Sequence, residues 1–183
     1  MKKSIVNSLE PSKQQLNDLL EYYQAGRYAD AEKLSLSITK EFPEHPFAWK
    51  VLGIVLKKTG RINEALIINQ KSVELEPTNM ETNYNLGNTL QELGRLEEAE
   101  ESFRQAIFLQ SDFTEAHYNL SWTLLKSGKI KEGLELYEWR LKRNRPKARL
   151  PRNHLIWDGI KSITRKNFFV YEEQGLGDII QFC

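Results

Sequence analysis

Four glycines recur along this chain at a constant spacing of 34 residues: Gly26, Gly60, Gly94 and Gly128. In each copy a basic residue directly follows the glycine. An acidic residue lies four positions after the glycine, and a small residue lies five positions after the glycine. A constant period of about 20 to 50 residues indicates stacked structural units, each of which folds against its neighbours. The period therefore restricts the chain to a repeat architecture.

Each copy of the repeat carries the pattern of two helices. In the second copy, residues that suit one helical face recur at the right spacing: Trp49, Leu52, Gly53 and Leu56. Gly60 follows where the first helix should end, and Pro77 where the second should stop. Because one helix pair cannot bury its own apolar face, stability must come from stacking. We therefore predict an all-α fold, a right-handed solenoid of about four helix-turn-helix units.

The motif residues of these copies resemble the tetratricopeptide repeat. In the third copy they are Asn83, Leu86, Gly87, Leu90, Ala99, Phe103 and Ala106. In the fourth copy they are His117, Leu120, Ser121, Leu124, Gly133 and Tyr137. The resemblance implies a tail at 1–11 and repeats at 12–45, 46–79, 80–113 and 114–147, of which the first is degenerate.

The resemblance also implies a binding surface, because the first helices of such repeats line a concave groove. The positions that we expect to contact a peptide or partner protein are Asn17, Lys50, Ile54, Lys57, Tyr84, Asn85, Asn88, Tyr118, Asn119 and Trp122. Val51 interrupts a column of asparagines that is similar to the ladder of O-GlcNAc transferases. A side-chain amide can donate and accept, so it can pair with any peptide backbone. We favour this function, and the alternative is that these amides bond only within the array.

Other residues give no sign of chemistry. We find no phosphate-binding loop, zinc-protease motif or nucleophile elbow, and Cys183 is the single cysteine. We therefore expect no catalytic residue, no metal and no cofactor. His117 should lie in the core, and the acidic run Glu97, Glu98, Glu100 and Glu101 should form a solvated face. No apolar run reaches the roughly 18 residues of a membrane span, so we expect a cytoplasmic protein.

A basic segment follows the fourth copy, although the net charge of the chain is only +1. The stretch from Trp139 to Trp157 contains no acid and seven bases: Arg140, Lys142, Arg143, Arg145, Lys147, Arg149 and Arg152. Nucleic-acid binding would need a patterned aromatic platform or a recognised fold, so we prefer a linker over residues 142–160.

The end of the chain changes character. Residues 167–171 form an apolar run that favours a strand, and a glycine turn with Gly175, Gly177 and Asp178 follows. Together with the repeats, this segment resembles bacterial fusions to a heptosyltransferase-like or O-GlcNAc transferase-like glycosyltransferase. We therefore expect 161–183 to be the truncated start of an α/β domain. A single strand is no stable sheet, so the chain as it stands should not be an enzyme.

Two functions follow from these observations. The first is a scaffold that binds a peptide or partner protein in the concave groove. The alternative is a region that presents substrates to a glycosyltransferase domain absent from this chain, in which case a nucleotide sugar would be a partner only of the longer protein.

Overall fold

The structure is a computed structural model, and it describes residues 10–143. This part of the chain consists of helices and contains no strand: α1 (Lys13–Gln24), α2 (Tyr28–Glu41), α3 (Pro46–Lys58), α4 (Ile62–Leu75), α5 (Met80–Glu92), α6 (Leu96–Leu109), α7 (Thr114–Lys126), α8 (Ile130–Tyr137) and the 3₁₀ helix η1 (Glu138–Lys142). The linker expected at 142–160 lies almost wholly outside the described residues, and the expected strand and glycine turn of 161–183 lie entirely outside them.

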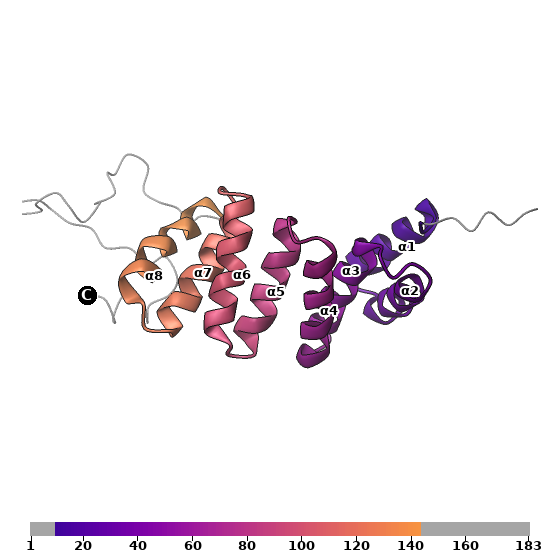
Figure 1. Ribbon diagram of the computed structural model, residues 1–183, viewed down its shortest axis with the longest axis horizontal. Helices are drawn as coiled ribbons and strands as arrows, with labels where there is room; N and C mark the ends of the chain where they lie inside the picture. The colour runs from indigo at the N-terminus through magenta and orange to yellow at the C-terminus, as the bar shows by residue number, and fades with distance from the viewer. Residues whose placement is uncertain (1–9, 144–183) are drawn as a thin grey trace, which may run out of the picture. The chain divides into compact units, whose positions relative to one another are not determined.

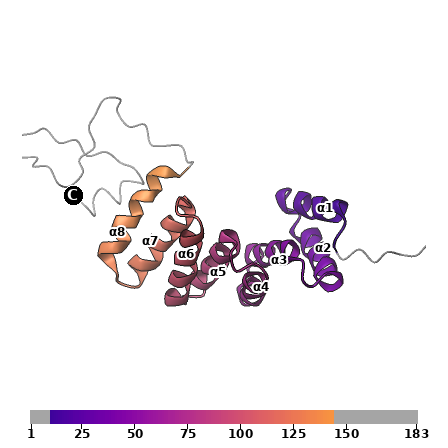
Figure 2. The same ribbon diagram turned by 45° about the horizontal axis from the view of Figure 1, so that its top comes forward.

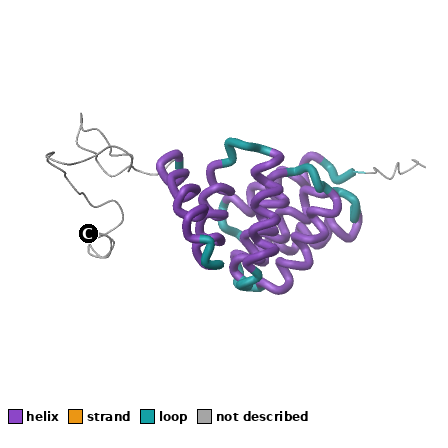
Figure 3. The backbone as a smooth tube through the Cα atoms, turned by 60° about the vertical axis from the view of Figure 1, so that its left-hand side comes forward, coloured by secondary structure: helices purple, strands orange, loops and turns teal. Residues whose placement is uncertain are grey.

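The helices form four pairs that stack in chain order. Each helix packs against the next one along the chain, and α1 and α8 lie at opposite ends of the described array (Figure 1). The same succession is visible in a second orientation (Figure 2), and short loops join all the helices (Figure 3). The prediction of an all-α solenoid of four helix pairs is confirmed for the part that the structure describes.

The glycine period sets the turn inside each pair. Gly26, Gly60, Gly94 and Gly128 have φ angles of 71°, 80°, 74° and 80°, in the left-handed region that favours glycine. At the second turn the Arg61 backbone N–H donates to the Leu56 carbonyl at 2.9 Å and closes the end of α3. The second helices therefore begin at a constant 34-residue interval, at Tyr28, Ile62, Leu96 and Ile130.

A side-chain hydrogen bond ties each of the helices α3, α5 and α7 to the loop before it. Trp49 Nε1 donates to the Pro43 carbonyl at 2.8 Å, and Asn83 Nδ2 donates to the Pro77 carbonyl at 3.1 Å. His117 Nε2 donates to the Ser111 carbonyl at 2.9 Å, and its side chain is only 9% exposed. The prediction that His117 is a core residue is confirmed. Trp49, Asn83 and His117 occupy corresponding positions of successive repeats, so three different side chains form the same kind of hydrogen bond there.

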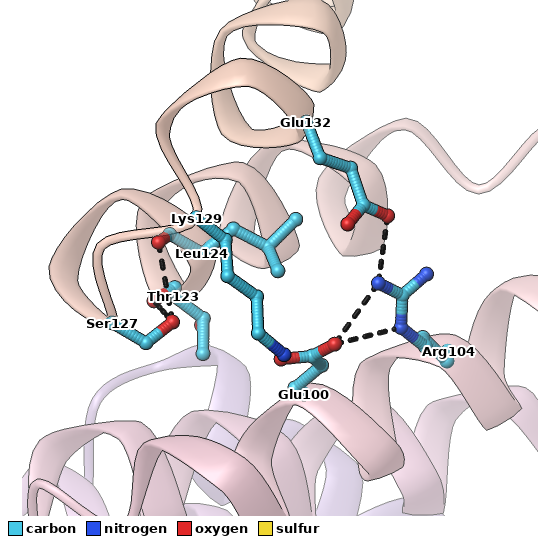
Figure 4. Close-up of polar contacts among 7 residues, drawn as sticks. All are labelled: Glu100, Arg104, Thr123, Leu124, Ser127, Lys129 and Glu132. Carbon is cyan, nitrogen blue, oxygen red and sulfur yellow. Dashed lines mark hydrogen bonds and ion pairs between the residues drawn. The ribbon is translucent and has the colours of Figure 1, made fainter.

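Three residues of the acidic run at the start of α6, Glu97, Glu98 and Glu101, are exposed as expected, whereas Glu100 is not. The Glu100 side chain is only 12% exposed, because it accepts from Arg104 at 2.9 Å and from Lys129 at 2.7 Å. Arg104 also pairs with Glu132 at 2.7 Å, so this group joins the third helix pair to the fourth (Figure 4). The sequence pattern of one helix could not reveal cations that come from the next turn and the next pair.

The fourth pair ends differently from the others. Helix α8 has 8 residues, whereas α2, α4 and α6 have 14 each. The chain continues as η1, in which Trp139 stacks on His117 with ring centroids 3.7 Å apart. The end of the described array is therefore held partly by an aromatic stack.

Candidate binding groove

A hollow opens between α3 and α5, where the second helix pair meets the third. Its volume is about 400 Å³, and its lining is Ile54, Lys57, Lys58, Asn69, Asn85, Asn88 and Glu92. Four of the ten residues that the sequence assigned to a groove thus lie around one hollow: Ile54, Lys57, Asn85 and Asn88.

The lysines of this surface are paired within the array. Lys57 Nζ lies 3.2 Å from Glu92 Oε2, and Lys50 Nζ lies 2.6 Å from Glu81 Oε2. Both pairs link α3 to α5. Glu81 and Glu92 were not among the residues expected in the groove, although opposite charges at facing positions of consecutive first helices could have indicated them. The surface is therefore close to neutral here, with both signs of charge at its edge.

The backbone carbonyl and the side-chain amide of Asn85 differ in their hydrogen bonding. Its backbone carbonyl accepts from Thr89 Oγ1 at 3.0 Å and from Asn69 Nδ2 at 3.5 Å. Within residues 10–143 the structure shows no hydrogen bond made by the amide group of the Asn85 side chain. One donor group and one acceptor group therefore face the hollow without a protein partner in that range.

The other residues of the asparagine column behave differently. Asn119 Nδ2 donates to Asn88 Oδ1 at 2.6 Å and to the Tyr84 hydroxyl at 3.1 Å, so this amide bridges α7 and α5. Asn17 is exposed on α1, and Val51 is only 3% exposed because it packs in the core. In this column, the Asn85 amide has no partner among residues 10–143, and the Asn119 amide bridges two helices. Asn17 is exposed, and Val51 belongs to the core.

An aromatic cluster lies beyond Asn119. Tyr118 stacks on Tyr137 with ring centroids 5.8 Å apart, and Trp122 meets Tyr137 edge-on at 5.7 Å. The Arg143 guanidinium lies 4.2 Å from the centre of the Tyr118 ring. Trp122 keeps 40% of its side chain exposed and is the part of this cluster that a ligand can reach most easily. Tyr84 instead packs against Phe103 and Phe113.

Within residues 10–143, His, Cys, Asp and Glu side chains form no group of three that could hold a metal ion. No described helix is both long enough and apolar enough to cross a bilayer.

Comparisons with known proteins identify the repeat. Models of the tetratricopeptide repeat match residues 19–79 and 69–101. The matched part of the chain, residues 19–101, consists of tetratricopeptide repeats. No curated protein sequence matches it.

Solved structures of such repeats are similar to the chain. MamA from Desulfovibrio magneticus RS-1 superimposes with a TM-score of 0.65 and 20% identity, over 76% of this chain and 80% of that one. At this identity the likeness bears on the fold alone. An O-GlcNAc transferase mutant of Thermobaculum terrenum superimposes with a TM-score of 0.60 and 25% identity, over 68% of this chain and 23% of that one. The described repeats therefore correspond to about a quarter of that longer chain.

Proposed function

We propose that this chain is a scaffold that binds an extended peptide, or an extended segment of a partner protein, across α3 and α5. The observation that carries the proposal is the hollow of about 400 Å³ with the open Asn85 amide on its wall. An amide can donate to a peptide carbonyl and accept from a peptide N–H, so it holds backbone of any sequence. Ile54 adds apolar contact beside it.

The remaining groove residues take separate roles in this proposal. Lys50 and Lys57 keep their acidic partners and define the edge of the site. Asn88, Tyr84 and Asn119 hold the wall between α5 and α7 through their shared hydrogen bonds. Trp122 and Tyr118 extend the surface toward the last pair, where an exposed aromatic ring suits an apolar side chain of the ligand. Asn17 lies on α1 and forms the far end of the path.

The test is a peptide selection followed by titration. A library of random peptides is selected on the full chain, and the best binder is titrated against the wild type, Asn85→Ala and Asn63→Ala. Asn63 is an exposed asparagine on α4, so it is a matched control. We expect Asn85→Ala to weaken binding about tenfold, since each lost hydrogen bond is worth about 0.5–1.5 kcal/mol, and Asn63→Ala to bind like the wild type.

Two results would contradict the groove assignment. One is a failure to select any peptide that binds. The other is an affinity that Asn85→Ala leaves unchanged while helicity, measured by circular dichroism, stays at the wild-type level.

A second function is supported by the likeness to the O-GlcNAc transferase structure and by the glycine turn at Gly175–Asp178 in the sequence. In this proposal the groove presents a protein substrate to a glycosyltransferase domain of a longer parent protein. The intact mass of the native product decides it. A product much larger than this chain supports the second function, and a product of this length removes it.

A further inference from the structure

The first helix pair presents a polar end to the described array. In α3, Ala48, Val51 and Val55 are at most 3% exposed, because they pack against α2 of the preceding pair. The corresponding positions of α1 hold Gln14, Asn17 and Glu21, and all three are exposed. A polar outer face is what the terminal unit of a stacked array needs in water. The N-terminal end of the described array is therefore polar.

The last helix pair presents an apolar end. On α8, Ile130 is 52% exposed and Leu134 is 53% exposed. Their counterparts two repeats earlier, Ile62 and Leu66, are half-buried, and Leu66 packs against a core cluster of the following pairs. Ile130 and Leu134 thus stand at positions that a following layer covers in the interior of the array.

The chemistry at this position is not dictated by the repeat. The residue that corresponds to Leu134 in α6 is Glu100, which forms ion pairs, and in α2 it is Glu32, which pairs with Arg61. A leucine here cannot form an ion pair and gains only from burial. Leu141 of η1, later in the chain, is also exposed, at 39%. Several large apolar side chains at one end of a fold mark a contact surface.

We propose that this terminal face, formed by Ile130 and Leu134 of α8, binds the same face of a second copy of the chain. A two-fold axis brings identical patches together, so the patch must complement itself. The apolar residues satisfy this condition, and Lys131 and Glu135 beside them carry opposite charges and are both exposed. In two antiparallel α8 helices, Lys131 of each copy lies beside Glu135 of the other.

The opposite end of the array does not fit this face. A second copy that docked with α1 would place Gln14, Asn17 and Glu21 on apolar side chains and bury their polar groups without partners. Growth from end to end is therefore disfavoured, and the assembly closes at two copies.

The proposed interface is small, so association of the two copies must be measured over a wide range of protein concentration. Stable specific interfaces bury about 1,200–2,000 Å² in total, more than the two apolar side chains on each copy supply. We therefore expect weak association, with a dissociation constant of roughly 10–100 µM. The mass of the full chain in solution should rise from one copy to two as its concentration increases from about 5 to about 500 µM.

The experiment is sedimentation equilibrium on the full chain and on matched variants. Leu134→Glu and, independently, Ile130→Lys should remain monomeric over the whole range with unchanged helicity. Ile67→Glu is the control, because Ile67 is an apolar residue of α4 that is 65% exposed and lies away from the end. It should dimerise like the wild type. Lys131→Glu should weaken the dimer at least threefold, and adding Glu135→Lys should restore it.

Several outcomes overturn the proposal. A wild type that stays monomeric at every concentration removes it, whatever covers the face instead. A dimer that survives both Leu134→Glu and Ile130→Lys places the contact elsewhere, and a mass that grows beyond two copies contradicts a closed pair. None of these variants touches Asn85 or the hollow, so peptide binding can succeed or fail independently of this result.

Discussion

The second and third helix pairs have the same backbone arrangement, but side chains at corresponding positions differ in their chemistry. Asn69 of α4 and Phe103 of α6 stand 34 residues apart, in the same column of the repeat. Both are buried, at 2% and 0% exposure. Each lies on a glycine of the preceding first helix: a Cβ on Gly53 would collide with Asn69 Oδ1, and one on Gly87 would lie 2.8 Å from the Phe103 ring.

The two side chains stabilise their surroundings by different means. Phe103 packs in an apolar cluster with Leu90, Leu120 and Leu124. Asn69 donates to Thr89 Oγ1 at 2.9 Å, but its buried Oδ1 accepts no hydrogen bond from any residue of 10–143. A repeat column thus fixes where a side chain goes and leaves open whether it acts by burial or by hydrogen bonding.

The largest expected effect on the free energy of unfolding distinguishes Phe103 from Asn69. Phe103→Ala should lower the free energy of unfolding by about 3–5 kcal/mol, because it leaves a cavity between α5 and α6. Asn69→Leu should cost less than about 1 kcal/mol, since it removes an unpaired buried oxygen, adds apolar burial and leaves Thr89 bonded to the Asn85 carbonyl. Urea denaturation followed by circular dichroism measures both. Losses of equal size would remove the distinction between the two columns.

A smaller effect concerns another pair of counterparts, Leu66 and Glu100. Burial alone would raise the pKa of Glu100, but hydrogen bonds from Lys129 and Arg104 outweigh it and hold that pKa below its usual range. Because the lowered pKa belongs to the folded state, the stabilisation is present above the unfolded pKa of about 4.3 and is lost as the pH falls through the folded value.

Glu100→Gln should therefore cost about 1–2 kcal/mol at pH 7, and its difference from the wild type should shrink below about pH 4. Leu66→Ala is the matched variant at the same column. Its cost should not change with pH, because no titratable group is removed. Denaturation at a series of pH values provides the measurement, and a loss for Glu100→Gln that persists undiminished in acid would contradict the ionic account.

The smallest difference is expected at the turns. Gly60 and Gly94 have positive φ angles of 80° and 74°, and a Cβ on either would meet open space. Alanine at either position should therefore lose about 1 kcal/mol through backbone strain alone. Thermal denaturation of Gly60→Ala and Gly94→Ala should give equal losses. Clearly unequal values would mean that the two turns are not equivalent, in spite of their common geometry.

The sequence was sufficient for the backbone plan of the described repeats. Helix ends, glycine turns and the stacking of pairs depend on residues close together in the chain, whose conformational preferences repeat with the period. His117 could be assigned to the core for the same reason, because its column holds Trp49 two repeats earlier in the array. The positions in a peptide groove stay predictions until binding is measured.

Which side chains form hydrogen bonds or ion pairs could not be derived from the local periodicity of the sequence. Asn85 and Asn119 occupy one column, yet one amide is open and the other bridges to Tyr84 and Asn88. Glu100 and Leu66 also share a column and have opposite chemistry. Local periodicity controls the path of the backbone, because φ and ψ respond to near neighbours. Hydrogen bonds, ion pairs and exposed ends depend on distances between side chains of different helix pairs, and those distances exist only once the pairs have packed.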